Sequence, residues 1–116
     1  MKFVALVVIA EAEYEADFKR IAKSAGASGA TIIEAKGSGV EEKKTFFSLT
    51  FEGNQSVILY ILEEAMARKV LKALKVFIDD SDNKGLAFTT PILNIVGLDK
   101  TLLSQFEKNI EDEERL

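Results

Sequence analysis

Two short polar segments carry residue types suited to binding an ion. Gly37-Ser38-Gly39 follows an apolar run, and consecutive backbone N–H groups at such glycines can form a nest for an anion. The alternative is a plain loop that leaves a strand, since Gly-x-Gly is common in turns. Asp79, Asp80, Asp82 and Asn83 offer hard oxygen ligands, but no further carboxylate completes the spacing of a calcium loop. A solvated loop is therefore favoured there, and we predict no metal site.

The composition excludes most of the usual catalytic groups. The chain has no Cys and no His, so thiolate chemistry, imidazole bases and the common zinc ligands are ruled out. The paired carboxylates Glu63-Glu64 and Glu113-Glu114 are adjacent in sequence at expected helix ends, where side chains usually face solvent. We predict that the protein is not an enzyme.

The charge distribution argues against nucleic-acid partners. The net charge is −4, and residues 107–115 hold five acids and two bases, so the body is nearly neutral and the tail is acidic. Duplex binding usually needs clustered Lys and Arg, and none is present. The apolar start Phe3–Ala10 is short and is followed by Glu11, Glu13 and Glu15, which favours a buried strand over a membrane segment. A cytoplasmic protein is expected.

The periodicity of apolar residues predicts an α+β fold with the order β-α-β-β-α-β and a C-terminal helix. Apolar, β-branched runs predict strands, and stripes at helical spacing predict helices. The expected strands of this order are residues 3–10, 30–36, 57–62 and 86–90, with 92–96 as an extension, and the helices are 11–25, 63–78 and 101–110. Thr45–Phe51 reads either as a strand or as an arm of a loop hairpin.

This order is that of a ferredoxin-like sandwich, an antiparallel four-stranded sheet with both helices on one face. The runs Phe3–Ala10 and Val57–Leu62 are apolar on both sides. Because two helices cover only one face, the other face needs a cover, most simply further copies of the chain. The sequence therefore predicts self-association.

Three stretches resemble the PII signalling family: Gly29–Gly39, Val57–Leu62 and Lys84–Pro91. They resemble the second strand running into the T-loop, the strand that leaves that loop, and the end of the B-loop with the last strand. The resemblance covers about residues 1–98, with 37–56 as a T-loop-like segment and 99–116 as a separate C-terminal helix and tail. It implies a homotrimer that senses nucleotides and regulates a transporter or enzyme of nitrogen metabolism.

The resemblance also implies site residues. An adenine nucleotide, an effector rather than a required cofactor, would lie in a cleft between subunits. One subunit would supply Thr31, Gly37, Ser38 and Gly39, with the backbone near Ile61 and Leu62. The neighbouring subunit would bring Asp82, Asn83, Lys84 and Gly85 toward the phosphates; for Lys84, an ordinary surface lysine is the alternative.

The T-loop-like segment would dock on a partner protein through Glu41, Lys43, Phe46 and Phe47, although the two phenylalanines also fit a strand packed in the trimer core. Several positions depart from the family pattern. Leu86 stands where the family has a phosphate-binding lysine, Glu41 replaces a glutamine, and no tyrosine lies between 37 and 56. We therefore expect weaker nucleotide binding than in standard members and no tyrosine uridylylation.

Two other classes fit the same element order. One is a structural or interaction module of the CutA type, with no nucleotide site. The other is a small ferredoxin-like enzyme of the monooxygenase or muconolactone type, which the lack of polar pocket residues disfavours.

Overall fold

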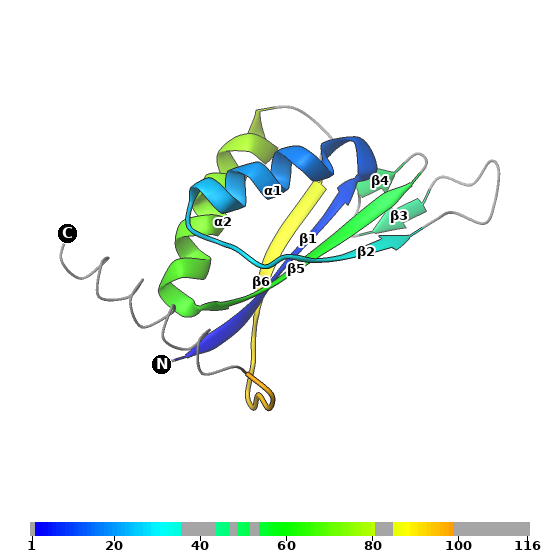
Figure 1. Ribbon diagram of the computed structural model, residues 1–116. Helices are drawn as coiled ribbons and strands as arrows, with labels where there is room; N and C mark the ends of the chain where they lie inside the picture. Colours follow the sequence, from blue (N-terminus) through cyan, green and yellow to red (C-terminus); the bar gives the residue numbers. More distant parts are fainter. Residues whose placement is uncertain (1, 36–43, 47–48, 52–53, 81–84, 99–116) are drawn as a thin grey trace.

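The computed structural model describes residues 2–35, 44–46, 49–51, 54–80 and 85–98 (Figure 1). The elements follow the order β1 (Phe3–Glu11), a short 3-10 helix (Ala12–Tyr14), α1 (Glu15–Ser24), β2 (Thr31–Ala35), β3 (Lys44–Phe46), β4 (Leu49–Phe51), β5 (Gln55–Glu63), α2 (Glu64–Asp79) and β6 (Gly85–Pro91).

Four strands form one antiparallel sheet in the order β2-β5-β1-β6. The two central strands, β1 and β5, are the apolar runs recognised in the sequence. Short strands β3 and β4 pair separately, as a hairpin between β2 and β5. The predicted α+β, ferredoxin-like arrangement is confirmed. Residues 45–51, interpreted as one strand or one arm of a hairpin, instead contribute to both short strands of the hairpin.

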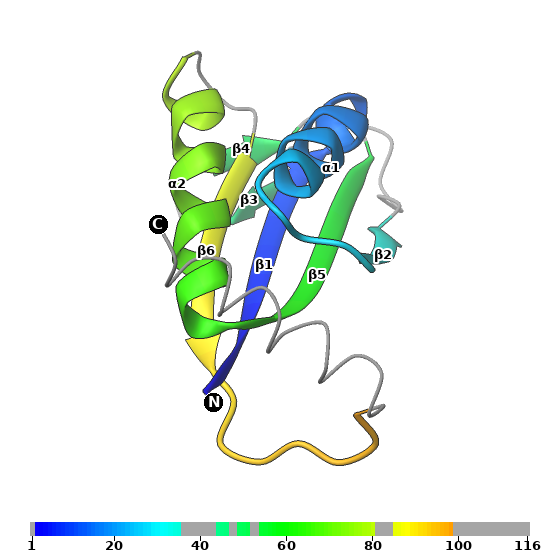
Figure 2. The same ribbon diagram turned by 60° about the vertical axis from the view of Figure 1, so that its left-hand side comes forward.

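Both helices pack on the same face of the sheet, as Figures 1 and 2 show. Side chains alternate along β1 and β5, so the buried residues of both strands point toward the helices. The aromatic ring of Phe18 on α1 meets Phe77 on α2 edge to face, with centroids 5.1 Å apart. The buried core consists of Leu6, Val8, Ala10, Phe18, Ala22, Ala27, Ile58, Tyr60, Leu62, Met66, Ala67, Val70 and Leu74.

The first helix begins later than the apolar spacing predicts. Glu11 belongs to β1, where it pairs with Gln55, and the Ala12 N–H donates to the Asn54 carbonyl over 3.0 Å. These sheet contacts hold the chain extended through Glu11, and a 3-10 turn separates it from α1. Gly26, predicted as the helix stop, follows α1 with a φ of 117°, which glycine adopts readily.

The last strand ends at Pro91, and residues 92–96 do not extend it. Proline lacks the N–H that would continue the ladder. Beyond the strand, the Ile92 N–H still reaches β1, donating to the Phe3 carbonyl over 3.3 Å. The predicted C-terminal helix, with Asp99 and residues 101–110, lies outside the described residues. No helix in the described ranges is long and apolar enough to cross a membrane.

Candidate functional site

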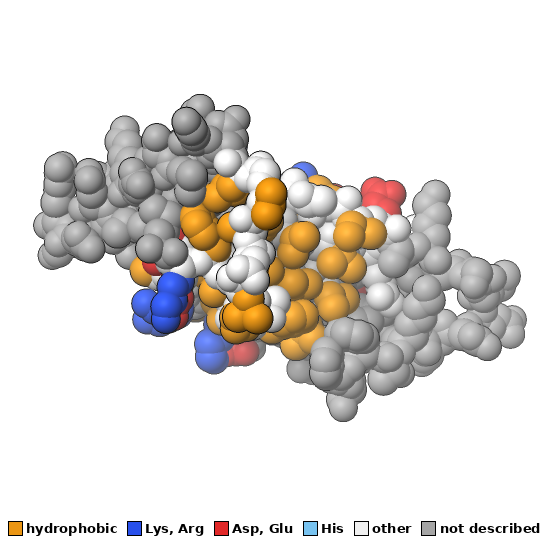
Figure 3. Space-filling view, turned by 90° about the horizontal axis from the view of Figure 1, so that it is seen from below, with side chains coloured by type: hydrophobic (Ala, Val, Ile, Leu, Met, Phe, Trp, Pro, Cys, Tyr) orange, Lys and Arg blue, Asp and Glu red, His pale blue; other side chains and the backbone are white. Residues whose placement is uncertain are grey.

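The sheet face opposite the helices is apolar and carries no element of this chain among the described residues. Register places Val7 between Leu59 and Phe88, and Ile9 between Val57 and Leu86, so these side chains share one face. Ile33 on β2 and Ile61 on β5 are 54% and 39% exposed there. Figure 3 shows the hydrophobic side chains gathered on this side of the molecule. The open face comprises Ala5, Val7, Ile9, Ile33, Val57, Leu59, Ile61, Leu86 and Phe88.

The open face ends in a polar pair near the β3–β4 hairpin. Glu11 on β1 lies directly across from Gln55 on β5. The Gln55 Nε2 atom is buried and has no hydrogen-bond partner among the described residues. A buried amide of this kind is normally satisfied, so it marks a place where a further group would be stabilising.

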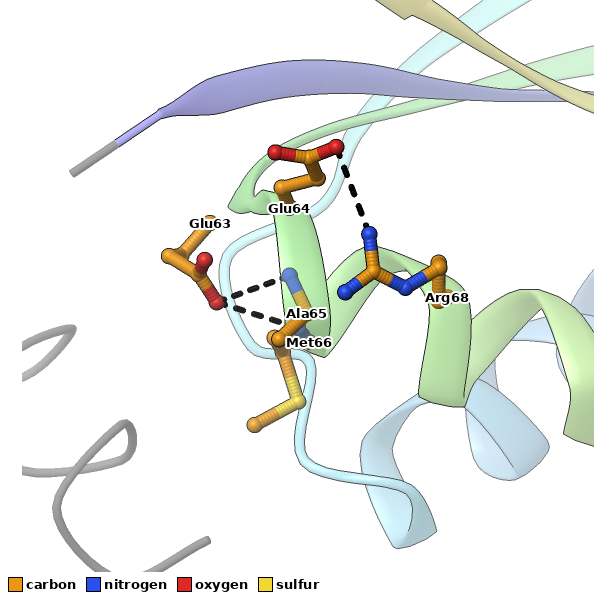
Figure 4. Close-up of polar contacts among 5 residues, drawn as sticks. All are labelled: Glu63, Glu64, Ala65, Met66 and Arg68. Atoms are coloured by element: carbon orange, nitrogen blue, oxygen red, sulfur yellow. Dashed lines mark hydrogen bonds and ion pairs between the residues drawn. The ribbon is translucent and has the colours of Figure 1, made fainter. Parts of the chain in front are cut away.

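The N-terminus of α2 is occupied by its own chain. The Glu63 carboxylate accepts hydrogen bonds from the N–H groups of Ala65 and Met66, over 2.9 and 3.2 Å (Figure 4). Glu64 adds an ion pair with Arg68 at 3.3 Å. This cap satisfies donors that would otherwise bind an external anion. A phosphate site must therefore be sought elsewhere on the molecule.

Three of the predicted effector residues lie on β2 and β5. Thr31 begins β2, is exposed, and pairs with Leu59; Ile61 lies two residues further along β5 on the same open face. Leu62 points the other way, into the core, and is 2% exposed. Leu62 can thus offer only backbone groups to a ligand, as the resemblance required.

Gly85 lies at the other side of the sheet, at the start of β6, where it pairs with Ala10. A Cβ atom at Gly85 would come within 2.6 Å of the Ile9 carbonyl oxygen, so the strand requires glycine there. Phe46 lies in β3. The remaining predicted residues lie outside the described ranges: Gly37, Ser38, Gly39, Glu41, Lys43, Phe47, Asp82, Asn83 and Lys84.

The predicted site residues therefore divide between two opposite edges of the sheet. Thr31 is on edge strand β2, Gly85 is on edge strand β6, and β5 and β1 lie between them. Three inter-strand steps of nearly 5 Å separate these edges by about 14 Å. Among the described residues, one chain does not bring the two groups together.

A groove of about 330 Å³ runs beside Gly85, between α2 and β6. Its apolar wall includes Leu71, Ile78 and Ala87, and its polar groups come from Lys72, Lys75 and Asp79. Lys75 contacts Asp79, whereas Lys72 makes no ion pair within the described part of the chain. The sequence reasoning missed Lys72. The available signal was that Lys72 and Lys75 are three residues apart and therefore neighbours on the surface of α2, toward the end that leads to Gly85.

The described residues offer few other groups that could bind a metal or take part in catalysis. They contain no group of three or more His, Cys, Asp or Glu arranged to hold a metal ion. Burial raises the pKa of Tyr60 above its ordinary value of 10.0, but this side chain faces the core and is 3% exposed. Tyr60 is therefore a packing residue.

Comparison with known proteins identifies a matching sequence family and similar folds. The sequence model of the family described as "Nitrogen regulatory protein P-II" matches residues 1–100. Among solved structures, the chain resembles CPII from Thiomonas intermedia K12 bound to ADP and bicarbonate, with a TM-score of 0.59 and 18% identity, over 79% of this chain and 87% of that one.

Two further structures are similar. A CPII structure bound to ADP, AMP and bicarbonate has a TM-score of 0.60 and 17% identity over 84% of this chain and 98% of that one. A putative PII-like signaling protein from Thermus thermophilus has a TM-score of 0.59 and 23% identity, over 79% of this chain and 91% of that one. Comparison with curated proteins returned no match. At these identities the structural likeness supports the fold alone.

Proposed function

This chain belongs to the nitrogen regulatory protein P-II family, and we propose that it acts as a cytoplasmic PII-like signalling protein. In this proposal it is a homotrimer that binds an adenine nucleotide at the clefts between subunits. Occupied clefts change the state of the 37–56 segment, which then engages or releases a partner protein. The partner is a transporter or a metabolic enzyme, in nitrogen metabolism by the family relationship.

The observation that carries the proposal is the division of the site between the two sheet edges. Thr31 and Ile61 lie toward the β2 edge, and Gly85 lies on the β6 edge, about 14 Å away. A ligand too compact to span the sheet can contact both groups only where two subunits meet, which supports a cleft between subunits. The open face supports the assembly this requires, because an apolar face of this kind is normally covered.

The charges beside the β6 edge support an anionic ligand. Lys72 lines the groove next to Gly85 and has no ion pair among the described residues. Lys84, which directly precedes Gly85, adds a second cation in sequence. In this chain Leu86 follows Gly85, where a phosphate-binding lysine is expected. We propose that Lys72 supplies that charge from α2 instead.

The ligands bound in the similar solved structures narrow the choice of effector to test. The CPII structures hold ADP with bicarbonate, in one case with AMP as well. An adenine nucleotide is thus the first ligand to test, and bicarbonate is the second. For this chain, weaker affinity than in standard family members is expected, since each lost charge-assisted hydrogen bond costs about 1.5–3 kcal/mol.

The signalling step is a change in loop state. A ligand shifts a protein between two states only by binding one of them more tightly. Gly37, Ser38 and Gly39, in contact with the nucleotide, would link the cleft to Glu41, Lys43, Phe46 and Phe47, the proposed partner-docking residues.

Thermal unfolding with ATP, ADP, AMP and bicarbonate, singly and combined, tests the proposal. A ligand at 100 times its Kd stabilises the folded state by about 2.7 kcal/mol, which is a clear shift in Tm. Calorimetric titration then compares Lys72→Ala with Lys19→Ala, an exposed lysine on α1. We expect about a tenfold or greater loss of nucleotide affinity for Lys72→Ala and none for Lys19→Ala.

Two results would count against the proposal. Unchanged Tm with every nucleotide would favour the CutA-type interaction module, which the family match does not favour. A monomeric mass by light scattering at micromolar concentration would remove the intersubunit cleft.

A further inference from the structure

A second groove lies at the opposite end of the sheet from the β3–β4 hairpin. Its volume is about 620 Å³. The apolar lining comes from the start of β1 and from the chain at and after Pro91: Phe3, Val4, Pro91, Ile92, Leu93 and Ile95. Lys2 and Glu64 complete it. We call it the basal groove.

The basal groove continues into an unusually apolar and exposed stretch of backbone. Residues 92–98 leave the end of β6 as an extended arm (Figure 2). Leu93 at the groove and Val96 beyond it are 91% and 96% exposed. Single exposed apolar residues are ordinary, but a cluster of them beside an apolar groove marks a contact surface.

Of the two charged residues that line the basal groove, Glu64 is already engaged, and its carboxylate disfavours a small anionic ligand. Glu64 pairs with Arg68, and the Glu64 N–H donates to the Lys2 carbonyl over 2.9 Å. Glu63 caps the first turn of α2 just beside it (Figure 4). Apart from Lys2 and Glu64 the lining is apolar, so the occupant should present an apolar stripe.

The chain itself carries such a stripe, which begins four residues beyond the described arm. Leu102, Leu103, Phe106 and Ile110 recur at helical spacing and fall on one side of a predicted helix about 15 Å long. Lys108 falls on the opposite side. This segment lies beyond the range that the family sequence model matches, residues 1–100.

The short tether favours this segment over any other occupant. Three residues after Leu98 reach at most about 10–11 Å, so a helix beginning at residue 101 starts close to the arm. Gly97, with a φ of 92°, allows the chain to reverse there. A segment tethered this closely has a local concentration on the order of millimolar, far above a micromolar protein in solution.

We propose that the basal groove is the docking site of the chain's own segment 101–110, held by Leu102, Phe106 and Ile110 against Leu93 and Ile95. This inference is independent of the proposed function. It assigns the groove to packing of the C-terminal segment and leaves the edges at Thr31 and Gly85 to the effector.

A single tryptophan reports directly on the contact, because the chain has none. In the full chain, Phe106→Trp should show blue-shifted emission and protection from quenching, whereas Lys108→Trp should emit as an exposed indole. Adding Leu93→Asp to Phe106→Trp should shift the emission to the red. Adding Val76→Asp, a substitution at a 74% exposed site on α2, should leave it unchanged.

Cysteine trapping identifies which copy supplies the segment, since the chain also has no Cys. Leu93→Cys is combined with Leu102→Cys or Phe106→Cys, and the oxidised protein is run on a non-reducing gel. An intrachain disulfide, at the mass of one chain, is the expected product. A covalent dimer would overturn the proposal by assigning the groove to a second copy.

Two other results would also overturn it. If Phe106→Trp and Lys108→Trp emit alike, the stripe is not docked. If Leu93→Asp leaves the Phe106→Trp emission unchanged but lowers the oligomeric mass in light scattering, the arm is an interface between copies.

Discussion

The Ser56 hydroxyl donates a hydrogen bond of 2.7 Å to the carboxylate of Glu15, joining β5 to the first turn of α1. Ser56 is the one buried polar residue among the described residues, with 1% exposure, and Glu15 is only partly buried. The hydroxyl and the carboxylate therefore respond differently to the loss of their partner. A buried hydroxyl has no access to water, whereas the carboxylate can be rehydrated.

Removing Glu15 should therefore cost more stability than removing Ser56. Glu15→Ala leaves the Ser56 hydroxyl buried without a partner, at about 1–3 kcal/mol, in addition to the lost bond. Ser56→Ala removes the bond but leaves a group that water can reach. Urea unfolding of both variants measures the difference. Equal losses, or a larger loss for Ser56→Ala, would contradict this account.

A charge on the open face should prevent assembly without unfolding the chain. Ile33 is 54% exposed on edge strand β2, so Ile33→Asp costs little in an isolated chain but places a carboxylate inside the proposed trimer. Light scattering should show a smaller mass than for the parent protein. Val76→Asp, on the helix side, is the control and should keep the parent mass.

Gly85→Ala should destabilise the fold by steric conflict. The added Cβ would lie 2.6 Å from the Ile9 carbonyl oxygen and 3.1 Å from the Ala10 Cα, both backbone atoms with little freedom to move. We expect a loss of about 1–3 kcal/mol in the free energy of unfolding. Thr89→Ala, at an exposed position of the same strand, should change it by less than about 0.5 kcal/mol.

Alkaline pH should weaken the fold through Tyr60. Because burial raises the pKa of Tyr60 in the folded state, the unfolded state ionises first. Stability from this group is thus fully present below pH 10 and falls as pH rises from 10 toward the folded pKa, by at most about 1.4 kcal/mol per pH unit. Tyr60→Phe should flatten that fall in urea titrations between pH 9 and 11.

Mixed assemblies test the division of the cleft between subunits. In a trimer that combines a β2-edge variant, Thr31→Arg, with a β6-edge variant, Lys72→Glu, one cleft receives an unaltered edge from each neighbour. Because about one quarter of randomly assembled trimers hold a single variant and no unaltered cleft, we expect coexpressed protein to bind nucleotide at about one quarter of the parent stoichiometry, while each variant alone binds poorly. No recovery on mixing would place both residues in the same half of the site.

The elements that form the core were predictable because their patterns are strong. Apolar β-branched runs indicated β1 and β5, and helical stripes indicated α1 and α2. The extension of β1 to Glu11 was not predictable, because it depends on pairing with Gln55, a residue far away in sequence. The end of β6 at Pro91 followed from proline chemistry, whereas the extension to Val96 was wrong.

The site was less accessible to sequence reasoning than the fold. Thr31, Ile61 and Gly85 were placed by resemblance, and their separation across the sheet became visible only with the strand order. Lys72 was hidden among the other lysines of α2, since its place in the groove depends on how the helix rotates against β6. The segments 37–43 and 81–84 carry predictions that stay predictions.

The apolar character of both sides of β1 and β5 has a consequence for strand alignment. In most antiparallel sheets a shift by one residue moves apolar side chains into water, and that penalty fixes the alignment. Here such a shift exchanges one apolar side for another. The alignment must instead be held by a few contacts: Glu11 opposite Gln55, Ser56 on Glu15, and Gly85 against Ile9. Mistakes in folding should therefore concentrate at these few positions rather than spread along the strands.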